Sequence, residues 1–168
     1  MNYAQIRKHD IANGPGIRSS LFVSGCTHNC PGCFNTDYKK FNYGEIWDEE
    51  IEETFINYIK EPIIKGVTIL GGEPMDQLRD DDLLNLLIRI KDETKKNIWL
   101  YSGYTYEQIL AHKKRKKILE LTDVLVDGLY VQELKDLRLK FRGSSNQRII
   151  DVKKSLETGL VNMLEGYE

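Results

Sequence analysis

The sequence lacks the features of several specialised classes of protein. No apolar run is long enough to span a membrane, and residues 1–10 contain no apolar segment of the kind found in a signal peptide. We therefore expect a cytoplasmic protein with no membrane partner. The net charge of −2 and the 30% of charged residues argue against strong disorder, and also against a basic protein that binds nucleic acid.

Cysteine is scarce, and its placement is informative. The chain has three cysteines, Cys26, Cys30 and Cys33, which all lie within eight residues of one another. An odd and clustered set in a cytosolic chain argues against a framework of disulfide bonds. The set favours a metal site or a redox centre instead.

The length of 168 residues suits one domain, residues 1–168, with residues 150–168 as a possible C-terminal appendage. The 40% of hydrophobic residues suffices for a core, and no Pro-rich or Ser-rich linker interrupts the chain. A closed barrel of eight strands and eight helices usually needs about 250 residues, so we do not expect one here.

Apolar runs alternate with amphipathic stretches along the chain. Short β-rich runs predict strands at 17–24, 66–70, 97–101 and 123–126, and helical spacing predicts helices at 47–60, 81–91 and 106–119. The tail from residue 142 combines a polar loop with a short strand and a weak helix. Strands separated by helices of this length indicate an α/β fold with a mainly parallel sheet.

Four of the predicted strands end in polar or glycine-rich loops, at 26–33, 71–74, 102–103 and 127–128. Ligands bind at the carboxyl ends of the strands in parallel α/β sheets. We therefore expect these four loops to meet at one edge of the sheet.

The cysteines are spaced Cys26-x3-Cys30-x2-Cys33. Three thiolates on a short loop can ligate three irons of a cubane 4Fe-4S cluster, which usually takes four cysteines. Because the chain has no fourth cysteine, one iron would be open to a ligand from outside the protein. Two alternatives remain: a structural zinc site formed by the cysteines with His28, and three unligated buried thiols.

Several segments together resemble the radical S-adenosylmethionine (SAM) enzymes, and within them the activating proteins of the anaerobic (class III) ribonucleoside-triphosphate reductase. They are Asn13-Gly-Pro-Gly-Ile-Arg18, Leu21-Phe-Val-Ser-Gly-Cys26, Cys30-Pro-Gly-Cys-Phe-Asn35, Gly71-Gly-Glu-Pro74, Ser102-Gly-Tyr104, Val126-Asp-Gly128 and Arg142-Gly-Ser-Ser-Asn-Gln147. The first and last of these point to this branch. Many superfamily members carry an aromatic residue before the third cysteine; here Gly32 holds that place and Phe34 follows Cys33.

The resemblance implies a partial, open (βα) barrel of the radical SAM type. It also implies an oxidoreductase that cleaves SAM reductively at a 4Fe-4S cluster with one open iron. The resulting 5′-deoxyadenosyl radical would create a glycyl radical on the large subunit of the reductase, with electrons from a low-potential donor such as flavodoxin. No acid–base pair is needed, and the three histidines are interpreted as surface residues.

The resemblance also suggests a role for each site residue. Cys26, Cys30 and Cys33 would hold the cluster. The backbones of Gly71 and Gly72, with the carboxylate of Glu73, would bind the methionyl amine of SAM. Contacts near the nucleoside or sulfonium are expected from Gly32, Cys33 and Phe34. Ser102 and Asp127 are weaker candidates, for which a turn or helix-cap role is equally consistent.

Other interpretations stay open. The target could be a different glycyl-radical enzyme or a small metabolite, or the chain could be a zinc-stabilised binding module without catalysis. A partial barrel would leave a lateral opening that admits a loop of a partner protein, which agrees with a protein substrate. The basic run 112–117 is interpreted as a solvated helix face, and residues 142–147 as either a surface loop or a docking segment.

Overall fold

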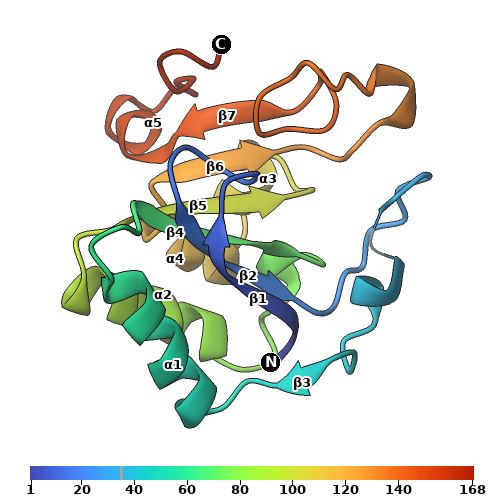
Figure 1. Cartoon of the computed structure of the whole chain (residues 1–168). Coiled ribbons are helices and arrows are strands. Elements are labelled where there is room, and N and C mark those ends of the chain that lie inside the picture. The colour runs from blue at the N-terminus through green and yellow to red at the C-terminus, as the bar shows by residue number, and fades with distance from the viewer. Residues whose placement is uncertain (35) are drawn as a thin grey trace.

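The computed structural model describes residues 1–34 and 36–168; Asn35, the last residue of the motif at 30–35, lies outside the described residues. Seven strands form one sheet in the order β3-β1-β2-β4-β5-β6-β7 (Figure 1). The strands are β1 (Asn2–Asp10), β2 (Arg18–Val23), β3 (Glu45–Ile46), β4 (Gly66–Gly71), β5 (Asn97–Ser102), β6 (Val124–Asp127) and β7 (Arg148–Asp151). The helices are α1 (Glu49–Lys60), α2 (Asp82–Glu93), α3 (Tyr106–Leu110), α4 (Lys113–Glu120) and α5 (Val152–Thr158), with short 3-10 turns η1 (Thr36–Lys39), η2 (Pro74–Asp76) and η3 (Gln132–Leu134).

The four central strands β2, β4, β5 and β6 are parallel to one another, and the strands at both sides of them are antiparallel. Among the described residues, the edge strands β3 and β7 each have one neighbour and do not pair with each other, so the sheet is open. The prediction of an α/β fold with an unclosed sheet and a parallel centre is confirmed.

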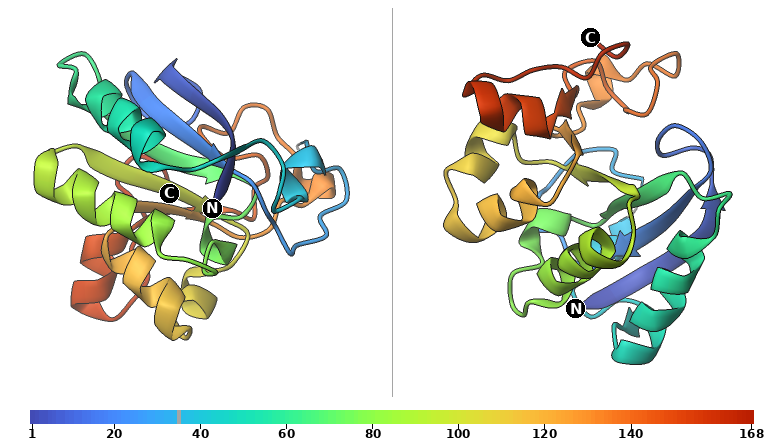
Figure 2. Two further views of the ribbon diagram at one scale, coloured as in Figure 1. Left: turned by 90° about the horizontal axis from the view of Figure 1, so that it is seen from below. Right: turned by 90° about the vertical axis from the view of Figure 1, so that its left-hand side faces the viewer.

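The core lies mainly between the sheet and the helices. Alternate residues of the central strands, such as Leu21, Ile69 and Leu100, pack with the buried faces of α1 and α2. Helices lie toward the left and bottom in the left view of Figure 2, whereas the loop that carries the cysteines (residues 26–33, the cysteine loop) lies at the right. Residues that point to the other face of the sheet, including Trp99 and Val126, pack with Phe141 and Tyr167 from the C-terminal part of the chain. Strands covered on both faces explain why these runs are almost continuously apolar.

Arg18 begins β2 on the face that carries Trp99 and is 1% exposed. Its Nε donates to Thr68 Oγ1 at 2.8 Å, and its guanidinium carbon lies 5.5 Å from the Trp99 ring centroid. A further bond to Pro15 O, at 3.2 Å, holds the loop that precedes the strand. Arg18 lies at the opposite end of β2 from the cysteine loop, so it supports loop-to-strand entry and does not line the site.

Two features differ from the sequence prediction. The helix predicted at 106–119 is divided into α3 and α4, because His112 has an extended backbone and its Nδ1 accepts the Arg115 N–H, so that a new helix begins there. Residues 2–10 and 45–46, for which we predicted no element, form β1 and β3. Across the described part of the chain, no helix is both long and apolar enough to cross a membrane.

Candidate active site

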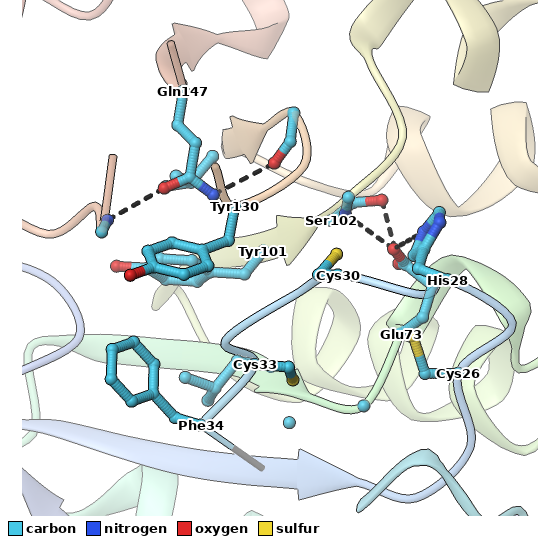
Figure 3. A pocket seen from close by; sticks show the side chains of 17 residues that line it. Cys26, His28, Cys30, Cys33, Phe34, Glu73, Tyr101, Ser102, Tyr130 and Gln147 are labelled. Carbon is cyan, nitrogen blue, oxygen red and sulfur yellow. Dashed lines mark hydrogen bonds and ion pairs between the residues drawn. The ribbon is translucent and has the colours of Figure 1, made fainter. Parts of the chain in front are cut away.

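A pocket of about 250 Å³ opens at the carboxyl ends of β4, β5 and β6 (Figure 3). The lining includes all three cysteines, residues 71–73 at the end of β4 and just after it, Ser102 at the end of β5 and Gly128 after β6. The strand register explains this meeting, because Val23 pairs with Gly71 and Ser102 pairs with Asp127. The prediction that the four loops converge at one edge of the sheet is confirmed.

The three cysteines are free and partly exposed. The loop that carries them is held at its start by the Cys26 N–H, which donates to Lys39 O at 3.0 Å, and turns where the Cys33 N–H donates to Cys30 O. Burial raises the pKa of Cys26 to about 11, and burial together with the nearby Cys33 raises the pKa of Cys30. A metal that binds Cys26 and Cys30 must therefore displace protons that these two thiols hold more tightly than usual.

The arrangement of possible donors bears on whether the cysteines hold an iron–sulfur cluster or a single zinc ion. Within residues 1–34 and 36–168, no three or more His, Cys, Asp or Glu side chains converge closely enough to hold one metal ion. His28, the fourth ligand of the zinc alternative, has its Nε2 2.7 Å from Glu73 Oε1. Zinc needs all its donors within about 2.3 Å, whereas the thiolates around a cubane each bind a different iron. Three clustered thiols, with no fourth cysteine in the chain, suit three irons of a cubane cluster.

Glu73 is 1% exposed, and its carboxylate is bonded on all sides. Oε1 accepts the Gly103 N–H at 2.7 Å and faces His28, while Oε2 accepts the Met75 N–H and the Ser102 hydroxyl, each at 2.9 Å. The carboxylate therefore anchors the end of β5 and the cysteine loop. Any ammonium group that entered the pocket would have to share oxygens that already have protein partners.

The interpretation of His28 as a surface histidine is wrong. Its side chain is 15% exposed, and the hydrogen bond with Glu73 raises its pKa even though burial acts in the opposite direction. This contact could not be predicted from the sequence, because the two residues are 45 positions apart.

Gly71 ends β4 beside Val23, the last residue of the parallel strand β2, and Gly72 follows it. Gly71 has a φ of +107°, and a Cβ there would lie 2.6 Å from Val23 O. A Cβ on Gly72 would lie 2.6 Å from Gly25 O. Both glycines are therefore needed for the close approach of this loop to the segment that leads into the cysteines.

The remaining predicted site residues differ in their surroundings. Phe34 lines the pocket, is 70% exposed and has its ring centroid 5.4 Å from that of Tyr130. Gly32 has a φ of +76° and lies against the side chain of Gln132, outside the lining. Asp127 is buried, accepts the Tyr106 N–H at the start of α3 and pairs with Arg148, so it supports the start of this helix, whose N-cap residue is Thr105.

Lining residues that the sequence analysis did not place in the site include Tyr101, Tyr130, Gly143 and Gln147. Gln147 braces this side of the pocket, because its Oε1 accepts the Gly143 N–H at 2.9 Å and its Nε2 donates to Gly128 O at 3.0 Å. The segment 142–147 is thus folded onto the pocket, and its polar motif was the available signal.

Comparisons with known proteins agree with this chemistry. Residues 12–150 match the family model described as a 4Fe-4S single cluster domain. The chain is 43% identical over 150 residues to the anaerobic ribonucleoside-triphosphate reductase-activating protein of Escherichia coli (strain K12), an alignment that covers 88% of this chain and 96% of that protein. Proteins of the same name from Haemophilus influenzae and from Enterobacteria phage T4 are 41% and 35% identical, over 89% of this chain and 97% and 93% of theirs.

Identity at this level over nearly the whole of both chains, with three cysteines gathered at a pocket at the carboxyl end of a parallel sheet, establishes the relationship. The chain belongs to the family of anaerobic ribonucleoside-triphosphate reductase-activating proteins and contains the 4Fe-4S single cluster domain.

Proposed function

We propose that this protein activates an anaerobic ribonucleoside-triphosphate reductase by generating a glycyl radical on its large subunit. The observation that carries the proposal is a loop with three cysteines, and no fourth cysteine in the chain, at the edge of a pocket. Such a donor set leaves one iron of a cubane cluster without a protein ligand. When bound and reduced, the cluster supplies the electron that cleaves SAM to methionine and a 5′-deoxyadenosyl radical, which takes a hydrogen atom from a glycine of the partner.

The residues of the pocket would divide the work of binding. Cys26, Cys30 and Cys33 would hold the cluster, and the backbone around Gly71 and Gly72 would accept the methionyl amine. Glu73 would act mainly through its negative charge, since its oxygens already accept hydrogen bonds. Gly32, Cys33 and Phe34 would lie near the nucleoside or sulfonium, and Ser102 would be a weaker contact to SAM at the end of β5. The exposed ring of Phe34 suits a contact that forms when a ligand enters.

The architecture that goes with this function is a partial (βα) barrel of the radical SAM type, built as a single domain of residues 1–168. The C-terminal residues support a single unit, because Tyr167 packs edge-on against Trp99 with ring centroids 6.0 Å apart. The open sheet supports access from the side, which a loop of a protein substrate requires. A low-potential protein such as flavodoxin would deliver the electron.

Electron paramagnetic resonance (EPR) tests the proposal. The anaerobically reconstituted protein should hold about four irons per chain. Mixed with the reductase, SAM and a reductant, it should produce a glycyl doublet that needs all the components, with release of methionine and 5′-deoxyadenosine. A colourless protein that holds one zinc ion would contradict the proposal. SAM cleavage without a doublet would redirect it to another glycyl-radical enzyme or to a metabolite.

A further inference from the structure

The residues between Cys26 and Cys30 contact two carboxylates from the segment that follows β4. Thr27 donates from both its backbone N–H and its Oγ1 to Asp76 Oδ2, each at 2.8 Å. The next residue, His28, bonds to Glu73 at 2.7 Å. Two consecutive residues of the cysteine loop are thus each held by a carboxylate, and the two carboxylates are only three positions apart.

Asp76 is buried, with its side chain 4% exposed. Its second oxygen, Oδ1, accepts a hydrogen bond from the Tyr104 hydroxyl at 2.7 Å and another from Arg115 Nη2 at 3.3 Å. Arg115 also donates from Nε to Met75 O at 3.0 Å. Arg115 is therefore the one residue of the basic run 112–117 that is not exposed, and its charge balances that of Asp76.

Tyr104 joins the two contacts into one unit. Its ring centroid lies 4.4 Å from that of His28, and its hydroxyl lies 3.3 Å from Thr27 Oγ1. The Arg115 guanidinium carbon lies 3.9 Å from the centroid of the same ring. The cysteine loop, the end of β5 and helix α4 are therefore tied together at one point beside Cys26.

We propose that Asp76 is a positioning residue for the cluster: together with Glu73 it clamps Thr27 and His28 and so fixes the separation of Cys26 and Cys30 before iron arrives. The physical reason is preorganisation. A loop held in its binding geometry loses less conformational entropy when it takes up a ligand, and it releases that ligand more slowly. This inference rests on the proposed cluster ligation by the cysteines.

The first test compares Asp76→Asn with Asp123→Asn in the reconstituted holoprotein. Asp123 is a matched control, because it accepts the Ile98 N–H at 2.7 Å and pairs with Lys91 at the opposite end of the strands. The readouts are the melting temperature and the rate at which iron passes to an excess of a ferrous chelator under anaerobic conditions. Because the charge of Asp76 strengthens both hydrogen bonds from Thr27, we expect Asp76→Asn to speed iron loss about tenfold or more, and Asp123→Asn to leave the rate unchanged.

The second test uses Thr27, which is exposed, so that its replacement does not endanger folding. Thr27→Val removes the hydroxyl that reaches Asp76 and should speed iron loss several-fold, whereas Thr27→Ser keeps the hydroxyl and should restore the parental rate. If Asp76→Asn and Thr27→Val release iron as slowly as the parent, Asp76 only stabilises the fold and the inference is overturned. A parent that takes up no cluster would instead contradict the proposed function, so the two failures are distinguishable.

Discussion

Glu73→Gln should destabilise the folded protein well beyond an ordinary loss of surface charge. Each carboxylate oxygen of Glu73 accepts one backbone N–H, from Gly103 at Oε1 and from Met75 at Oε2. A glutamine amide has one oxygen and one NH2 group. In either orientation of the amide, its NH2 group takes the place of one carboxylate oxygen. It then faces the backbone N–H of Gly103 or of Met75, which loses its acceptor.

The magnitude follows from these contacts. Ser102 can rotate its hydroxyl and His28 can change its tautomer, so both can adapt to an NH2 group. The orphaned backbone N–H costs about 1–3 kcal/mol, and the loss of charge from the other bonds adds about 1 kcal/mol, for a total of about 3 kcal/mol. For a domain of this size that corresponds to a fall in melting temperature of about 6–12 °C.

The assay is thermal unfolding of the apoprotein followed by circular dichroism. Glu107→Gln is the matched control, since Glu107 is 58% exposed and pairs with Arg148; it should cost less than about 1 kcal/mol. A fall for Glu73→Gln no larger than that of the control would refute the reasoning that the Glu73 oxygens are fully used by the protein.

Three further predictions concern the cysteine loop, the glycine at the end of β4 and stability at acid pH. Cys30→Ser should fold like the parent, because Cys30 lies on a partly exposed loop, but should lose most of the bound iron and the visible absorbance after reconstitution. Gly71→Ala should cost at least about 2 kcal/mol, since its Cβ would lie 2.6 Å from a backbone oxygen; Gly159→Ala has a similar positive φ but open space and should cost about 1 kcal/mol, as denaturant titration can measure. Asp10 is buried, which by itself would raise the pKa of its carboxyl. Hydrogen bonds from Asn13, Ser20 and the Ala12 N–H together have the stronger effect and lower this pKa below its ordinary value of 3.8. Its stabilisation is therefore present above that unfolded value and lost as the pH falls through the folded pKa, so Asp10→Asn should flatten the acid limb of the stability curve; an equally steep limb in the variant would contradict this.

The strands and helices were largely predictable because their signals are local. The apolar run Val67–Leu70 of β4 and the leucine-rich face of α2 are visible in consecutive residues, and both elements lie where the sequence placed them. The break at His112 was not visible, since it depends on a single residue that leaves the helical conformation. Strand β1 was missed because its sequence is polar, and it forms by pairing with β2 and β3.

The chemistry of the site was also determined by the sequence. Three clustered cysteines without a fourth give the proposed ligand set, and glycine at 71 and 72 permits a close backbone approach. These conclusions need only residue identity and spacing along the chain. The same holds for the convergence of the four loops, which follows from the alternation of strands and helices in a parallel sheet.

Only the tertiary structure decided which partners these residues have. Thr27 meets Asp76 across 49 positions and Tyr104 across 77, and Glu73 reaches Gly103 across 30. Hydrogen bonds act over about 3 Å, so such contacts depend on strand order and register, which a linear pattern does not encode. For this reason the sequence identified the cysteines proposed to bind a cluster, whereas only the tertiary structure showed which residues hold their loop in place.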